Sequence, residues 1–108
     1  MNIHAGDYVM LKSVDEVKHL YKEWKPFFTP KNALGKVEVF VDTGDKYLSC
    51  VMLNAMDAVN VYRVSWVDND KVCVFINDDA YSFDKKCIKS VYKLVRVGTN
   101  CKYLRKVI

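Results

Sequence analysis

The stretch from Val61 to Phe83, VYRVSWVDNDKVCVFINDDAYSF, decides the fold that the sequence predicts. Two runs rich in β-branched and aromatic residues, VYRVSWV and KVCVFIN, flank the three polar residues Asp68–Asp70. This arrangement is typical of a β-hairpin. A second polar pair, Asp78 and Asp79, then turns the chain into AYSF. The stretch therefore predicts three consecutive antiparallel strands.

The region before this stretch predicts one strand and one helix. GDYVMLK, residues 6–12, alternates as a short strand does. Ser13 precedes Glu16 by three residues, the spacing of a capping box at a helix start. Apolar residues then recur every three or four positions, so we expect an amphipathic helix over residues 13–25, ended by Pro26. Its expected buried face consists of Val14, Val17, Leu20 and Trp24.

Residues 27–60 connect this helix to the central stretch. FFTPKNALGK is predicted to be a connector with a single helical turn, in which Phe27 and Phe28 are core anchors; a ligand shelf is the alternative. The alternation of Val37, Val39 and Val41 predicts a strand. An excursion over residues 42–60 follows, with a further strand in YLSCVML and a polar interruption after it.

After the central stretch, Asp84 can cap a short turn that precedes the strand VYKLVRV. Residues 98–108 are expected to form a basic extension. Short strands at regular spacing favour a small, strongly bent barrel over a flat sheet. The sequence thus predicts a single domain over residues 1–108 that is mainly β with one amphipathic helix. The expected barrel core consists of Val64, Trp66, Val72, Val74, Ile76, Phe83, Ile88 and Leu94.

Two segments, HAGDYVMLKS and AYSFDKKCIKSVYKLV, resemble the ends of a small SH3-like β-barrel domain common in bacteriophage and other mobile-element proteins. The resemblance covers about a third of the chain and implies a phage-like origin and a binding role, without assigning any functional residue. Residues 42–60 and 98–108 depart from the pattern, so a particular function is expected there. The matching residues are Gly6, Asp7, Val9, Tyr81, Ser82, Phe83 and Ile88.

Composition and the N-terminal segment bear on the cellular location. The chain is 51% apolar, yet no run of it reaches the roughly 18–20 uninterrupted apolar residues of a membrane span. MNIHAGDY lacks the charged and apolar regions of a signal peptide. We therefore expect a cytoplasmic protein without a membrane partner, in the host cytoplasm if it is phage-encoded, with reduced thiols.

The four cysteines contain no close pair, which a zinc site normally needs. We expect no metal site and no cofactor, and buried, reduced cysteines that act as small apolar residues. A disulfide between Cys87 and Cys101 across neighbouring strands is the alternative. The cysteines are Cys50, Cys73, Cys87 and Cys101.

The sequence also lacks the usual signals of catalysis. Its four glycines are isolated and form no phosphate-binding loop, and no Gly-x-Ser-x-Gly motif occurs. His19 is expected on the solvated side of the helix. The acidic pairs Asp15–Glu16 and Asp78–Asp79 could act as acid and base, but helix starts and turns favour such residues for structural reasons. We therefore expect no enzymatic activity.

Charge is divided unevenly along the chain. Lys85–Ile108 holds eight basic and no acidic residues, whereas residues 1–84 hold nine basic and thirteen acidic ones, so the net charges are +8 and −4. This separation favours steering onto a complementary protein surface, with aromatic residues as anchors. The charge separation thus predicts an acidic protein as the partner. The resemblance to phage domains implies that this partner is a host protein, for instance a defence-system component that the chain inhibits by occlusion. The expected contact residues are Lys93, Arg96, Lys102, Tyr103 and Arg105.

Other interpretations of the basic end are nucleic-acid binding, a capsid or structural role, and a merely solvated sheet edge. The lysines and arginines of this end supply charge, and Tyr81, Tyr92 and Tyr103 supply stacking surfaces, a combination that suits single-stranded nucleic acid. The overall pI of about 8.8 lies just below the rough threshold of 9 that favours this function. Lysines on terminal strands can also serve only to prevent edge-to-edge aggregation.

Overall fold

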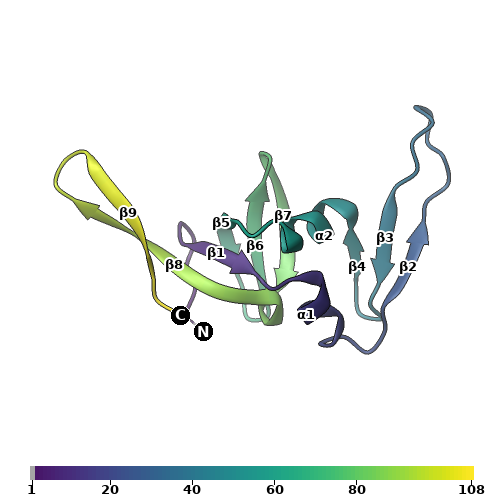
Figure 1. Ribbon diagram of the computed structural model, residues 1–108, viewed down its shortest axis with the longest axis horizontal. Helices are drawn as coiled ribbons and strands as arrows, with labels where there is room; N and C mark the ends of the chain where they lie inside the picture. The colour runs from purple at the N-terminus through teal and green to yellow at the C-terminus, as the bar shows by residue number, and fades with distance from the viewer. Residues whose placement is uncertain (1) are drawn as a thin grey trace. The chain divides into compact units, whose positions relative to one another are not determined.

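The computed structural model describes residues 2–108 and is mainly β, which confirms the predicted class (Figure 1). The chain divides into two compact units. The terminal unit comprises the residues up to Lys12 together with Val59–Ile108. The inserted unit comprises Ser13–Ala58 and enters the chain between the first two strands of the terminal unit.

The terminal unit contains a six-stranded antiparallel sheet with the strand order β7-β6-β5-β1-β8-β9. The first strand lies between β5 and β8, so that Val9 is opposite Tyr62 on one side and Val91 on the other. The sheet is open: within residues 2–108 no closed barrel is formed, in contrast to the predicted closure. The strands are β1 (Tyr8–Leu11), β5 (Val61–Val67), β6 (Lys71–Ile76), β7 (Asp79–Asp84), β8 (Ile88–Val97) and β9 (Cys101–Lys106).

Local sequence explains the turns of this sheet. Strands β6 and β7 are joined by Asn77 and Asp78, whose φ angles of 50° and 68° suit a two-residue hairpin. Asp68 closes the preceding loop, because its side chain accepts hydrogen bonds from the backbone N–H groups of Asp70 and Lys71. A single 3-10 turn, η1 (Lys85–Cys87), precedes β8 where the sequence predicted a short turn.

Most of the predicted core of this unit is buried, but Trp66 and Leu94 are 44% and 43% exposed. The register of β5 shifts between Val64 and Trp66, which places Trp66 opposite Cys73. Such a bulge moves the following side chain to the other face of the sheet. Leu94 is exposed because it lies beyond the part of β8 that pairs with β1. The buried members are Val64, Val72, Val74, Ile76, Phe83 and Ile88.

The inserted unit combines a three-stranded antiparallel sheet, in the order β2-β3-β4, with two short helices. Asp57, the last residue of the second helix, accepts a hydrogen bond from the N–H of Val14, the first residue of the first helix. The elements are α1 (Val14–Lys18), β2 (Lys25–Phe28), β3 (Val39–Asp42), β4 (Tyr47–Ser49) and α2 (Cys50–Asp57). Its apolar core consists of Val17, Tyr21, Val41, Leu48, Met52, Ala55 and Met56.

The predicted helix over residues 13–25 is wrong in length. The capping box of Ser13 and Glu16 is present, but the helix ends at Lys18. Its β-branched and aromatic residues are weak helix formers, and residues from Lys25 onward pair with β3 instead. Pro26 fits there because β2 is an edge strand of its sheet. Leu20, predicted to be buried, is 40% exposed.

Two further predictions for this unit are corrected. Phe27 and Phe28 are not core anchors: they belong to β2 and are 38% and 71% exposed. The strand predicted in YLSCVML ends at Ser49, whose side chain caps α2 by accepting a hydrogen bond from the N–H of Met52. The excursion over residues 42–60 is therefore mainly a turn, a short strand and a helix.

Candidate functional site: the basic hairpin

The predicted contact residues all lie on the hairpin formed by β8 and β9. Strand β1 pairs with β8 only as far as Tyr92, whereas β9 pairs with residues 92–97 of β8. The outer part of β8 therefore has β9 as its sole strand neighbour among the described residues, and the two continue as a two-stranded ribbon (Figure 1). We call residues 93–106 the basic hairpin.

The register of the basic hairpin divides the predicted residues between two faces. Directly opposite residues of an antiparallel pair project to the same face, and successive residues alternate. Lys93 is opposite Arg105, and Tyr103 lies two residues from Arg105 on the same face. Arg96 is opposite Lys102 on the other face. The hairpin thus brings all five residues together, but no single flat surface can contact all of them.

Each face carries a pair of like charges directly opposite each other, Lys93 with Arg105 and Arg96 with Lys102. Such cross-strand pairs destabilise a sheet. The hairpin contains no acidic residue that could relieve the repulsion. Repulsion among the positive charges of the basic hairpin therefore opposes the pairing of β8 with β9.

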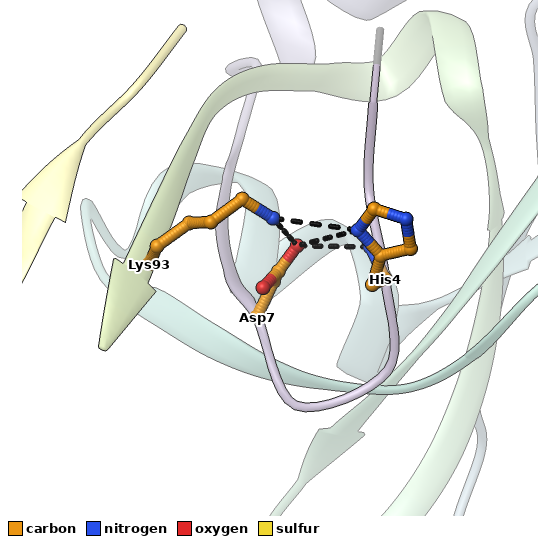
Figure 2. Close-up of polar contacts among 3 residues, drawn as sticks. All are labelled: His4, Asp7 and Lys93. Atoms are coloured by element: carbon orange, nitrogen blue, oxygen red, sulfur yellow. Dashed lines mark hydrogen bonds and ion pairs between the residues drawn. The ribbon is translucent and has the colours of Figure 1, made fainter. Parts of the chain in front are cut away.

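Lys93 is neutralised by a carboxylate at the start of the chain (Figure 2). Its Nζ atom lies 2.6 Å from Oδ2 of Asp7, a side chain that is only 12% exposed. The same oxygen accepts a hydrogen bond of 2.8 Å from the backbone N–H of His4, and Nδ1 of His4 lies 3.5 Å from Nζ. Lys93 thus ties β8 to the turn before β1, which is a structural task.

The other like-charge pair has no such partner. Within residues 2–108, neither Arg96 nor Lys102 lies within ion-pairing distance of a carboxylate. Both side chains line a hollow of about 230 Å³ at the tip of the hairpin. Thr99, Asn100 and Cys101 complete its lining, so a hydroxyl-bearing and an amide-bearing residue lie beside the two basic ones. This set of donors suits an oxyanion, and charged hydrogen bonds to such groups are the stronger ones.

Three residues of this region were not among the predicted site residues: Thr99 and Asn100 at the tip of the hairpin, and Asp7, the ion-pair partner of Lys93. A turn signal was visible in Gly98–Asn100, but nothing in the sequence related this turn to Arg96. Asp7 and Lys93 are 86 residues apart, and only the strand order β1-β8 brings them together.

The cysteines and histidines form no further site in the part of the chain that the structure describes. No group of three or more His, Cys, Asp or Glu residues is placed there to hold a metal ion. All four cysteines are free; Cys73 and Cys87 are buried as predicted, whereas Cys50 and Cys101 are exposed. Burial raises the pKa of the Cys73 thiol, which keeps this sulfur protonated and weakly nucleophilic at neutral pH.

No helix within residues 2–108 is both long enough and apolar enough to cross a membrane. Comparisons of the chain with protein-family models, with curated proteins and with solved structures find no match.

Proposed function

We propose that this chain is a non-catalytic binding module whose basic hairpin docks on an acidic surface of a host protein. The observation that carries the proposal is the directly opposite pair Arg96 and Lys102, which has no carboxylate partner within residues 2–108. An anionic group bound at the hairpin tip would remove the repulsion between the two cations. Part of the binding free energy would then come from relief of a strain already present in the free protein.

We further infer that the terminal unit is related to SH3-like domains of phage and other mobile elements. Its strand order, in which β1 lies between β5 and β8, supports this assignment. The single turn η1 between the Tyr81–Phe83 segment and β8 also agrees with the resemblance. In this proposal the protein acts in the host cytoplasm as an inhibitor that occludes a defence-system component, with the basic hairpin as an added contact element.

An acidic protein suits the hairpin better than a nucleic acid does. Stacking of bases on Tyr103 would use one face of the hairpin, whereas Arg96 and Lys102 present their charges on the other. A single strand would have to engage both faces to combine stacking with those phosphate contacts. A protein surface needs only the tip or one face.

The proposal is tested by capture of host proteins from a nuclease-treated lysate with three charge variants of the full chain. The first variant is Arg96→Glu with Lys102→Glu, and the second is Tyr103→Ala with Arg105→Glu. The control is Lys31→Glu with Lys36→Glu, two exposed lysines of the inserted unit, which changes the net charge by the same amount as the first variant. Circular dichroism checks that each variant folds.

We expect the first variant, Arg96→Glu with Lys102→Glu, to weaken capture of the partner about tenfold or more, because it replaces two attractive charges by two repulsive ones. The control should capture the partner at nearly wild-type strength. Equal capture by all variants would contradict the proposal. Capture that occurs only in a parallel lysate without nuclease, and that falls steeply with salt, would instead indicate a nucleic acid.

A further inference from the structure

A second surface, on the inserted unit, is formed by three aromatic rings. Phe27 on β2 and Phe40 on β3 are directly opposite, and their rings stack with centroids 5.8 Å apart. Tyr47 on β4 meets the ring of Phe27 edge to face at 5.7 Å. Phe27 is 38% exposed and Tyr47 is 62% exposed, so this contacting group of rings remains open to solvent. We call these three residues the aromatic face.

The aromatic face lies opposite the face that holds the unit together. Val41 and Leu48, which alternate with its members along β3 and β4, are buried in the core of the inserted unit. The rings are therefore not needed to cover that core. Contacts among the rings hold them in one arrangement, and exposed apolar groups gathered in this way commonly mark interaction sites.

Carboxylates border the aromatic face. Asp42 is directly opposite Tyr47, and Glu38 immediately precedes β3, two residues before Phe40. Beside Tyr47 is a hollow of about 300 Å³ lined by Glu23, Asp42, Gly44, Asp45, Lys46 and Tyr47. It contains three carboxylates against one lysine.

The nearest further cation, Lys25, does not change the sign of this border. Lys25 is directly opposite Asp42, and its Nζ atom lies 3.5 Å from Oε1 of Glu23. Lys25 therefore offsets one of the three carboxylates, and the excess of negative charge falls from two to one. Lys31 and Lys36 belong to the loop beyond Glu38, at the other end of the hairpin formed by β2 and β3. The end of the aromatic face near Tyr47 is therefore the acidic end.

We propose that the aromatic face and its acidic end form a second docking surface, which takes a basic peptide segment of a partner protein. An arginine or lysine of that segment lies over Tyr47, with its charged group beside Asp42 and Asp45. Aromatic rings attract cations through their faces, and long basic side chains also bury their aliphatic stems against apolar surface. A neighbouring apolar residue of the segment contacts Phe27 and Phe40. Phosphates would be repelled by the same carboxylates, so a nucleic acid is disfavoured here.

The inference concerns a different surface from the basic hairpin, so the two proposals can fail independently. Its test is a titration of the ¹⁵N-labelled full chain, followed by NMR, with the octapeptide Gly-Ser-Arg-Leu-Arg-Leu-Gly-Ser. The same peptide with glutamate in place of arginine, and an octathymidylate, serve as comparison ligands. We expect the arginine peptide to shift amide signals of Lys25–Phe28, Val39–Asp42 and Tyr47–Ser49, and to leave those of the basic hairpin unchanged.

Two single variants provide a matched pair for this titration. Tyr47→Ala should weaken binding of the arginine peptide about fivefold, the loss expected for one exposed cation–ring contact. Phe28→Ala should leave the affinity unchanged, since Phe28 is 71% exposed but alternates with Phe27 and projects from the other face of β2.

Three results would overturn the inference. One is the absence of any shift on β2, β3 and β4 at millimolar arginine peptide. Another is equal binding of the glutamate peptide or of the octathymidylate to this surface. The third is an equal loss of affinity in the Tyr47→Ala and Phe28→Ala proteins, which would show that the aromatic face has no special part in binding.

Discussion

The two halves of β8 differ sharply although one run of sequence, IKSVYKLVRV, forms both. In the inner half, Ile88, Ser90 and Val91 are buried where the strand pairs with β1. In the outer half, Leu94, Arg96 and Val97 are exposed where only β9 accompanies the strand. The inner half contributes to the hydrophobic core, whereas the outer half exposes its charged side chains to solvent.

This difference shows that burial in a strand is set by its neighbours. The apolar residues of the outer half would be buried if another element packed against them. Within the described residues, the terminal unit places no further strand beside this part of β8. A two-stranded ribbon has little stability of its own in water. The basic hairpin therefore depends on the inner half of β8 for its anchorage.

Replacement of apolar residues in the two halves should have very different effects on the free energy of unfolding. Ile88→Ala should lower it by ~2–5 kcal/mol, because Ile88 is fully buried and the change leaves a cavity. Leu94→Ala should lower it by less than about 1 kcal/mol, since this side chain is already partly in water. Urea denaturation measures both values. Similar losses in the two variants would mean that the outer half is as well packed as the inner one.

The contact between Asp7 and Lys93 marks the boundary between the halves and should have an intermediate effect. Lys93→Met removes the partner of a mostly buried carboxylate, so we expect a loss of ~1–3 kcal/mol in the free energy of unfolding. Lys106→Met, a change of an exposed lysine on β9, should cost no more than about 0.5 kcal/mol. Thermal or urea denaturation of both variants gives the comparison.

A double-mutant cycle sharpens this second prediction. Asp7→Asn should cost much less in the Lys93→Met protein than in the wild type, because the carboxylate has already lost its counter-charge. Equal costs in both backgrounds would show that the 2.6 Å contact contributes nothing to stability.

The smallest expected effect is a gain of stability in the outer half. Lys102→Glu places a carboxylate directly opposite Arg96 and replaces repulsion by attraction, which should stabilise the hairpin by ~0.2–1 kcal/mol. The same change should weaken capture of an acidic partner. Hydrogen exchange of the amides in residues 93–106 measures the local effect.

Lys106→Glu is the matched control, because Lys106 is opposite Tyr92 and relieves no like-charge pair. Slower exchange in the Lys102→Glu protein only, combined with weaker capture, would support a hairpin that sacrifices stability for binding. Unchanged exchange in both proteins would show that the repulsion between Arg96 and Lys102 is too weak to matter.

Sequence patterns predicted the parts of the fold that local chemistry controls. The alternation and turns from Val61 to Phe83 correspond to β5, β6 and β7, and the capping box at Ser13 starts a helix. The basic character of residues 85–108 was also visible in advance. These features depend only on residues that are close in the sequence, so sequence patterns are sufficient to predict them.

Other features depended on contacts between distant segments. The helix that begins after Ser13 ends at Lys18, and the chain from Lys25 onward pairs with β3. A bulge after Val64 exposes Trp66. No single residue type predicts such a shift of register. The aromatic face was not predicted for the same reason, since the position of Phe27 depends on its pairing with β3 and on the ring of Tyr47.

For the candidate site, the amino-acid sequence by itself determined which charges are available: eight basic residues without an acidic one among the last twenty-four. Only the tertiary structure decided how they are used. The order β1-β8 brings Asp7 to Lys93 and neutralises that charge, whereas the register of β8 and β9 sets Arg96 against Lys102 without a counter-charge in residues 2–108. The physical reason is that charge is a property of each residue, whereas its neutralisation depends on distances that only folding establishes.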